Sequence, residues 1–401
     1  MSAPTAHRHH PWLIGTGVML VAFNLRPPLS SVGPLLTAIG TETGMSAAGA
    51  AVLTTLPVLC LGLGSAFGPL AIRRLGIDRG VLAGMLVIAA GLGLRGVSTL
   101  PSLFAGAGLA AAGIGLVGVL LPALVKRDFP HASGVLTGLY TMMLCLGAAA
   151  GAGLTVPLGD AIGRGWGPAL AAWAVPAGIA LLAWAPFAQG GSAPAPVKDR
   201  PRLFAEPLAW QVTGFMGLQS SLAYIQFGWL PAVLQSGGLS ALDAGYFAAL
   251  TMVAQAPGAL IVATLAARSR DQRGWVAGVM LASPVAFLAT VFGPPALLLP
   301  AGIVLGLSVG ASFGLGLTLI VLRAADTAAA GALSAMAQAV GYLIASLGPL
   351  GFGLAHEATG DWIVASLLYA GLSLAALAFG LGAGRERQIG QPTPRADDAA
   401  T

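Results

Sequence analysis

Arg26 is the residue of this sequence whose chemistry is most unusual for its surroundings. It lies within residues 12–36, an otherwise uncharged stretch, and Pro27 and Pro28 follow it directly. Because about 20 apolar residues span a bilayer, Arg26 falls near the middle of the membrane. An arginine there is unfavourable by about 3 kcal/mol on insertion scales. It is tolerated where it faces the protein interior, a partner or a watery cavity.

The two prolines predict a break in the helix that carries Arg26. Neither Pro27 nor Pro28 has an amide hydrogen, and each ring clashes with the preceding turn. Carbonyl groups freed inside a membrane must line a cavity or contact protein. Residues 12–36 therefore predict a broken helix that presents a fixed cation to a central cavity. The alternative is that the Arg26 side chain binds the freed carbonyls and only stabilises the kink.

Charges of opposite sign are missing from the predicted spans. None of the 14 Asp and Glu residues and none of the five His residues lies within a span, apart from Asp243 at the very start of the eighth. Proton-driven carriers usually titrate such a buried group. A buried guanidinium without a counter-ion in the chain indicates that the ligand brings the negative charge, since arginine binds carboxylate-like groups through two parallel hydrogen bonds. We expect the other arginine within a span, Arg95, to extend to the outer membrane interface, with substrate contact as the alternative.

Three further spans carry uncharged polar side chains at helical spacing. Gln219 and Tyr224 lie in the seventh span, Gln338 and Tyr342 in the eleventh, and Tyr140 in the fifth. Such groups either bind a small polar ligand or join neighbouring helices, where each hydrogen bond contributes about 0.6 kcal/mol. We favour a position in the cavity wall for Gln338 and Tyr140 and leave both alternatives open for the others.

The composition identifies the elements that must position these residues. Of the 401 residues, 56% are hydrophobic and 8% are charged, whereas soluble domains carry about 25% charged residues. The chain is therefore predicted to be an all-α membrane protein, and no alternating pattern indicates a barrel. The twelve apolar segments are 12–36, 46–70, 80–98, 101–125, 132–158, 166–187, 207–234, 242–266, 274–293, 296–323, 329–354 and 362–383.

A polar segment divides these spans into two sets of six. The halves resemble copies, since the interval from Trp12 to Arg26 equals that from Trp210 to Tyr224. We therefore predict twelve transmembrane helices in two pseudo-symmetric six-helix bundles. The predicted parts are an N-terminal bundle over 1–188, a cytoplasmic linker over 189–206, a C-terminal bundle over 207–387 and a disordered cytoplasmic tail over 388–401.

The basic residues predict the orientation in the membrane. With residue 1 in the cytoplasm and twelve crossings, 16 of the 19 Lys and Arg residues fall on the cytoplasmic side. The exceptions are Arg26 and Arg95, which lie within spans, and Arg164, which lies in an outside loop. This bias follows the positive-inside rule. We therefore expect a multi-pass protein of the inner membrane with both termini in the cytoplasm.

Several classes of function find no support in the sequence. It contains no metal-ligand cluster, catalytic triad or nucleotide-binding lysine motif, so we expect neither an enzyme nor a cofactor. The net charge of +5 comes from short loops and is not typical of nucleic-acid binding. A receptor would require a substantial soluble output domain, and the predicted tails are short. The expected partners are a small-molecule substrate and the lipid bilayer.

The residues around Arg26 also carry a family resemblance. Residues 24–27 (Asn-Leu-Arg-Pro) and 31–36 (Ser-Val-Gly-Pro-Leu-Leu) resemble the cyanate permease and 2-nitroimidazole transporter family of the major facilitator superfamily. Residues 121–130, 217–220 and 229–231 fit the same family. Ile72 stands where the superfamily's loop signature has Asp, next to the recognisable Gly68, Leu70, Arg73 and Gly76.

This resemblance implies a mechanism and a place for the site. Its members have two bundles that rock about a cavity lined by spans one, four, seven and ten, with contributions from two, five, eight and eleven, and it favours a monomer. On that scheme Arg95 stays peripheral. The residues that would meet at the middle are Arg26, Asn24, Tyr224, Gln219 and Gln338.

Together these features predict a secondary active transporter that works by alternating access. We expect its solute to be a small organic anion, cyanate-like or carboxylate-like, with Arg26 as principal anchor. The alternative is a proton-coupled exporter of small neutral or cationic aromatic drugs such as nitroimidazoles.

Overall fold

Helices account for almost all of the chain that the structure describes. The computed structural model describes residues 11–129, 132–163, 165–189, 203–325 and 327–389. Within these ranges the only β-type pairing is an isolated parallel bridge between Ala324 and Ile389. The predicted all-α class is confirmed.

The helices follow the order of the predicted spans. The first half contains α1 (Pro11–Asn24), α2 (Pro27–Ser30), α3 (Leu36–Thr43), α4 (Ala47–Ala66), α5 (Gly68–Leu75), α6 (Ile77–Leu94), α7 (Leu100–Asp128), α8 (Ser133–Ile162), α9 (Trp166–Ala171) and α10 (Ala174–Trp184). The second half contains α11 (Pro207–Ser236), α12 (Ala241–Ala267), α13 (Arg273–Phe292), α14 (Pro295–Leu322), α15 (Thr327–Thr359) and α16 (Ile363–Ala383). Four 3-10 turns join them: η1 (Gly33–Leu35), η2 (Arg95–Val97), η3 (Ala185–Gln189) and η4 (Leu203–Ala205).

Ten helical segments of the described chain are long and apolar enough to cross a membrane. The other two predicted spans differ for separate reasons. The first is divided among α1, α2 and α3, none of which reaches 18 residues. The seventh is α11, a helix of 30 residues whose glutamines and serines lower its hydropathy. The sixth span is interrupted between α9 and α10, where Pro176 cannot donate a hydrogen bond to the carbonyl of Ala172.

The predicted break in the first span is confirmed. Helix α1 ends at Asn24, and Arg26 is the residue that precedes α2. The amide of Leu25 binds the carbonyl of Ala22 at 3.2 Å, which tightens the last turn. Pro27 and Pro28 then start α2, where their missing amide hydrogens are least harmful.

Helix α8 holds the broken segment in place through small residues. A Cβ atom at Gly147 would overlap the carbonyl of Phe23, and one at Gly151 would overlap the Ser30 hydroxyl. The Ser30 hydroxyl donates a hydrogen bond of 2.8 Å to the carbonyl of Ala148. Close packing of this kind is the usual role of small residues between membrane helices.

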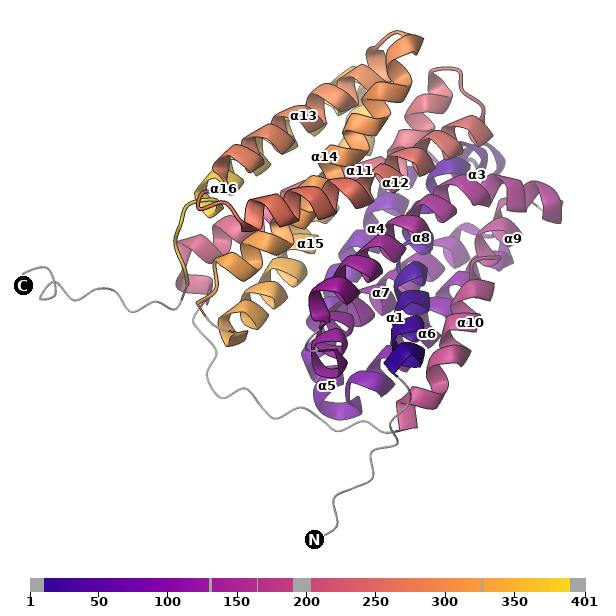
Figure 1. The fold of residues 1–401 in the computed structure, drawn as a ribbon. Helices are drawn as coiled ribbons and strands as arrows, with labels where there is room; N and C mark the ends of the chain where they lie inside the picture. The colour runs from indigo at the N-terminus through magenta and orange to yellow at the C-terminus, as the bar shows by residue number, and fades with distance from the viewer. Residues whose placement is uncertain (1–10, 130–131, 164, 190–202, 326, 390–401) are drawn as a thin grey trace, which may run out of the picture.

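The two halves lie side by side in Figure 1, one in indigo and magenta and the other in pink, orange and yellow. Helix α4 packs along α15, and α8 packs along α12, and these two pairs form the most extensive contacts between the halves. The backbones also meet directly, because a Cβ atom at Gly33 would lie 2.5 Å from the carbonyl oxygen of Phe227.

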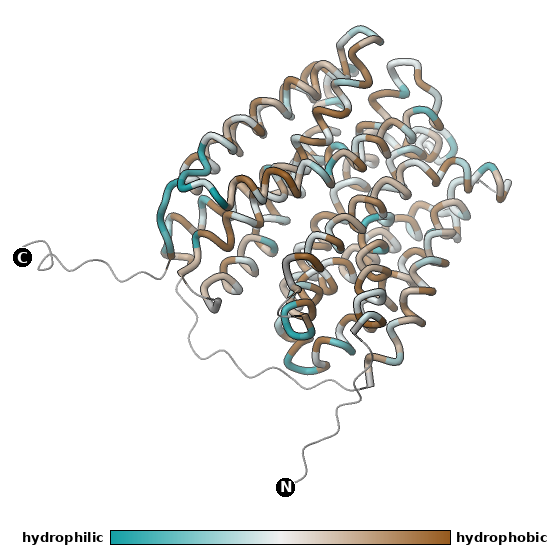
Figure 2. The backbone as a smooth tube through the Cα atoms, in the orientation of Figure 1, coloured by the Kyte–Doolittle hydropathy of each residue, from teal (hydrophilic) through white to brown (hydrophobic). Residues whose placement is uncertain are grey.

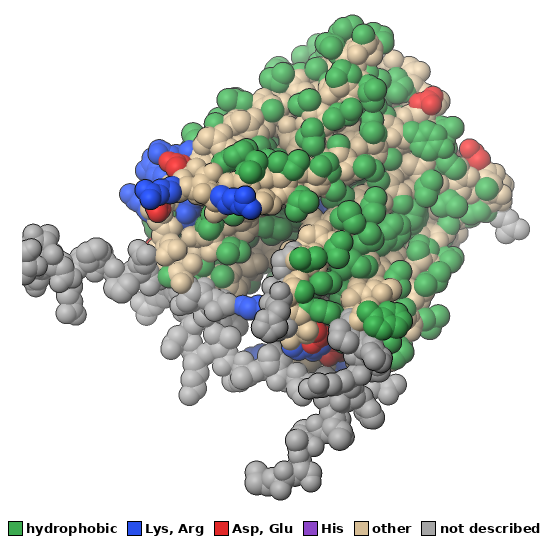
Figure 3. Space-filling view, in the orientation of Figure 1, with side chains coloured by type: hydrophobic (Ala, Val, Ile, Leu, Met, Phe, Trp, Pro, Cys, Tyr) green, Lys and Arg blue, Asp and Glu red, His purple; other side chains and the backbone are tan. Residues whose placement is uncertain are grey.

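Polar residues gather at the helix ends. Figure 2 shows hydrophilic segments at the ends of the helices and hydrophobic stretches between them. Lys and Arg gather toward one end, where α12 runs into α13, while Figure 3 also shows isolated acidic residues toward the opposite end. We call these the basic end, which carries Arg268, Arg270 and Arg273, and the opposite end, which carries Glu42 and Glu357.

A salt bridge orders the basic end of the first half. Ile72 occupies the position where the superfamily signature has Asp, yet Asp78, at the start of α6, accepts two hydrogen bonds from Arg127, at 2.7 and 2.8 Å. The backbone carbonyl of Asp78 also accepts a hydrogen bond from the Trp184 ring nitrogen at 3.0 Å. This network joins α6, α7 and α10 within one half.

Most of the predicted linker and tail, residues 190–202 and 390–401, lies outside the described residues. The edges of both segments are packed. Leu203 is buried in η4, next to the start of α11. Ile389 is 3% exposed, and its amide donates a hydrogen bond of 2.7 Å to the carbonyl of Arg323.

Candidate functional site

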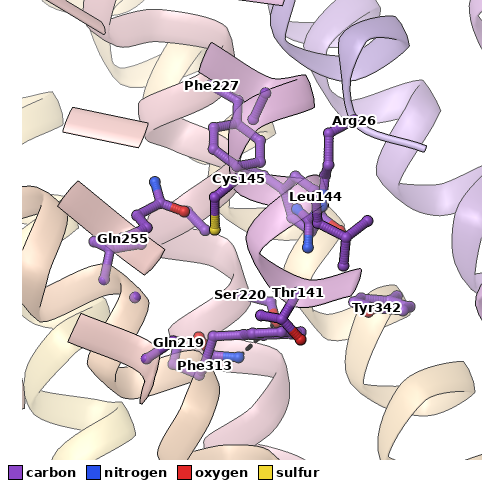
Figure 4. Close-up of a pocket in the computed structure, with 16 residues that line it drawn as sticks. Arg26, Thr141, Leu144, Cys145, Gln219, Ser220, Phe227, Gln255, Phe313 and Tyr342 are labelled. Carbon is purple, nitrogen blue, oxygen red and sulfur yellow. Dashed lines mark hydrogen bonds between the residues drawn. The ribbon is translucent and has the colours of Figure 1, made fainter. Parts of the chain in front are cut away.

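Two adjoining cavities lie between the halves at the level of the helix break. Their empty volumes are about 530 Å³ and 700 Å³. Figure 4 shows residues that line the smaller cavity. The residues common to both walls are Arg26, Thr141, Leu144, Tyr224, Phe313 and Tyr342.

Arg26 reaches into this space from the first half and meets aromatic rings of the second (Figure 4). Its guanidinium carbon lies 5.5 Å from the ring centroid of Phe227 on α11 and 5.7 Å from that of Phe313 on α14. A cation over an aromatic ring gains about 0.5–2 kcal/mol, depending on how dry the site is. The rings therefore offset part of the cost of holding the charge there.

The guanidinium of Arg26 binds no oxygen within the described part of the chain. No hydrogen bond or ion pair joins its side chain to a described residue. The backbone uses two carbonyls beside the break: that of Ala22 accepts the amide of Leu25 at 3.2 Å, and that of Arg26 accepts the amide of Leu29 at 3.0 Å. The alternative in which Arg26 only binds carbonyls freed by the break finds no support in this geometry.

The cavity walls carry no acidic side chain among the described residues. Arg26 is the one charged residue in the two walls, which otherwise consist of apolar, aromatic, hydroxyl, thiol and amide side chains. Hydrogen-bond donors with a fixed positive charge and no competing carboxylate suit an anion.

Three tyrosines surround the same space. Tyr224 and Tyr342 line both cavities, and Tyr140 lines the larger one. The rings of Tyr224 and Tyr342 meet edge to face, with centroids 6.2 Å apart, and the ring of Tyr224 meets that of Phe227 at 5.9 Å. The site therefore combines one cation with several flat aromatic surfaces.

Gln219 lines the smaller cavity with its amide held by neighbours. Its nitrogen donates to the Ser220 hydroxyl at 2.8 Å and to the carbonyl of Met216 at 3.1 Å, and its oxygen accepts a hydrogen bond from Ser312 at 3.1 Å. A polar group held in this way presents a fixed surface to a ligand. Gln338 lines the larger cavity, and its amide donates to the Ser334 hydroxyl at 3.0 Å.

Asn24 stands apart from the other predicted site residues. It is 3% exposed, lines neither cavity and donates a hydrogen bond of 2.9 Å to the carbonyl of Leu20 in its own helix. The structure brings together Arg26, Gln219, Tyr224, Tyr140, Gln338 and Tyr342.

Gln255 and Phe313 are wall residues that the sequence analysis missed. Gln255, on α12, lines the smaller cavity and donates a hydrogen bond of 3.0 Å to Gln226 on α11. Gln255 is an amide side chain in an otherwise apolar span, and this feature of the sequence could have identified it as a candidate. Phe313 lies in an apolar helix, where nothing in the sequence distinguishes it from a core residue.

The structure corrects the expectation for Arg95. Its side chain was expected to extend to the membrane interface, but Arg95 is 0% exposed. Its Cγ atom packs at the Cβ position of Gly106 on α7, because the 3-10 turn η2 directs the side chain back into the first half. None of its three guanidinium nitrogens has a hydrogen-bond partner among the described residues.

Comparisons of sequence identify relatives along nearly the whole chain. The Major Facilitator Superfamily profile matches residues 13–349. The 2-nitroimidazole transporter of Escherichia coli (strain K12) is 38% identical over 377 residues, which cover 93% of this chain and 95% of that protein. The cyanate transport protein CynX of the same strain is 32% identical over 369 residues, which cover 90% and 96%.

A solved structure shares the fold. The crystal structure of a bacterial homologue of the human lysosomal transporter Spinster, in an inward-facing and occupied conformation, superposes with a TM-score of 0.71. The match covers 94% of this chain and 95% of that one at 15% sequence identity, so it supports the fold alone.

Proposed function

The chain belongs to the Major Facilitator Superfamily, and from this premise we propose that it carries a small organic anion, cyanate-like or carboxylate-like, across the inner membrane. It is a secondary transporter and not an enzyme. The observation that carries the proposal is the position of Arg26, which lines both cavities without any hydrogen bond to a described oxygen. A bound anion would supply the missing acceptor.

The orientation in this proposal follows from the charges. The basic end of the molecule is the cytoplasmic end, since Lys and Arg concentrate on the cytoplasmic side of membrane proteins. The larger cavity extends from Arg26 toward this end, past Pro122 on α7 and Leu317 on α14. The structure then represents a carrier whose cavity faces the cytoplasm.

A second candidate is a proton-coupled exporter of small neutral or cationic aromatic drugs such as nitroimidazoles. The aromatic walls favour it, and one relative is a 2-nitroimidazole transporter. Proton coupling usually needs a titratable carboxylate or histidine near the site, and the described walls of the two cavities contain neither. This candidate predicts binding that does not depend on Arg26.

Transport by Arg26 variants distinguishes the two candidates. We expect Arg26→Gln to reduce uptake of labelled cyanate and benzoate into proteoliposomes by about 10- to 100-fold, the loss expected for a charge-assisted hydrogen bond. Arg74→Ala serves as the control, because it removes an exposed arginine outside both cavities. Full uptake by a folded Arg26→Gln protein would reject the role of Arg26.

A further inference from the structure

The charge of Arg26 lies across the boundary between the two halves. The arginine belongs to the first half, whereas both rings that contact its guanidinium, Phe227 and Phe313, belong to the second. Any rocking of the halves must therefore move the cation relative to these two rings.

Alternating access requires the cavity to close at both ends before it opens on the other side. In that closed state an empty cavity would enclose a guanidinium that has lost contact with water and has no counter-ion. Burying a charge without a partner is strongly unfavourable, whereas an ion pair with good hydrogen bonds repays much of the cost. An anion on Arg26 therefore lowers the barrier to closure.

The described cavity walls offer no carboxylate to neutralise the arginine, and thiol and phenol groups such as those of Cys145 and Tyr224 are ordinarily uncharged at neutral pH. The described walls contain no Asp, Glu or His that could gain or lose a proton as the halves move. The aromatic contacts compensate a cation only in part. The charge needed for reorientation must come from the solute.

We propose that this carrier is an obligatory anion exchanger, in which one small anion leaves only when another replaces it on Arg26. This inference rests on the proposed binding of an anion at the same site. It goes further because it specifies that the empty carrier does not readily reorient and that the direction of flux is set by the two anion gradients.

Efflux from proteoliposomes tests whether anion exchange is obligatory. Vesicles loaded with labelled benzoate or cyanate are diluted into buffer with or without the same unlabelled anion, while valinomycin and potassium hold the membrane potential at zero. After subtraction of protein-free vesicles, we expect external anion to accelerate efflux at least about tenfold, since an uncompensated buried charge raises the barrier by several kcal/mol. In Arg26→Gln, any residual efflux should be independent of external anion.

The outcomes separate this inference from the proposed function. Rapid, Arg26-dependent efflux into anion-free buffer would overturn obligatory exchange while leaving anion transport in place. No protein-dependent flux of either anion would overturn both. Exchange that persists unchanged in Arg26→Gln, with Arg74→Ala as the matched control, would show that another residue carries the coupling.

Discussion

At the scale of single residues, the nature of the site depends on what surrounds its one charge. Arg26 could be identified from the sequence because an arginine in a membrane span is costly and therefore informative. Its contacts with Phe227 and Phe313 could not be identified, since an aromatic side chain in an apolar helix has the same pattern whether it lines a cavity or packs in the core. Asn24 was predicted to line the cavity and does not, because its side-chain amide donates a hydrogen bond to the carbonyl of Leu20 in its own helix.

Arg95 provides a prediction at this scale. It is completely buried without a partner among the described residues, so its charge should destabilise the folded protein. We expect Arg95→Met, which keeps the length of the side chain, to raise the free energy of unfolding by about 1–4 kcal/mol. Thermal unfolding in detergent measures this change, with Arg95→Lys as the charge-retaining comparison. A lower midpoint for Arg95→Met would mean that the guanidinium makes a stabilising contact.

At the scale of elements, the broken first span decides where the cation points. The sequence predicted the break from Pro27 and Pro28, and α1 does end just before them. It could not predict how the break is supported, because the supporting glycines of α8 are more than 100 residues away. The order of the spans, and ten of them as long apolar helical segments, followed from hydropathy, whereas the interruption between α9 and α10 depends on local proline geometry within a uniformly apolar run.

Gly151 tests this support. A side chain there would overlap Pro27 and the Ser30 hydroxyl, so α2 must shift to accommodate it. We expect Gly151→Val to destabilise the protein by about 1–3 kcal/mol, the usual penalty for overpacking, and to lower anion uptake because Arg26 moves with α2. Gly138→Val is the matched control on the same helix, since no atom lies within 4 Å of an added Cβ atom there. Equal uptake and stability in the two variants would show that α8 does not position the break.

At the scale of the whole molecule, the halves are closed at the end opposite the basic end. The Glu357 carboxylate on α15 accepts a hydrogen bond of 2.8 Å from the amide of Ala48, in the first turn of α4. Gln235 donates a hydrogen bond of 3.1 Å to the carbonyl of Pro34 nearby. A carboxylate at a helix N-terminus contributes about 0.3–1 kcal/mol, so the first contact favours the closed arrangement of this end.

Glu357→Gln should loosen this closure. We expect the ratio of open to closed molecules at this end to rise about two- to fivefold, which corresponds to the loss of the charge at the helix terminus. Spin labels at Thr41 and Val364, in a protein without Cys60 and Cys145, report the separation of the halves. Glu42→Gln removes an exposed carboxylate on α3 and is the control. An unchanged distance distribution in Glu357→Gln would exclude a gating role for this contact.

Ligand-induced stabilisation of the purified protein tests whether Arg26 is the anchor for an anion. Benzoate and cyanate are compared with benzamide and 2-nitroimidazole, on the wild-type chain and on Arg26→Gln, by thermal unfolding. A ligand at 100 times its dissociation constant stabilises the folded state by about 2.7 kcal/mol, which moves the midpoint by several degrees. We expect an anion, but not benzamide, to raise the midpoint of the wild-type chain, and we expect no anion to do so in Arg26→Gln. Equal stabilisation of both proteins, or stabilisation by the neutral compounds alone, would contradict an anion site at Arg26.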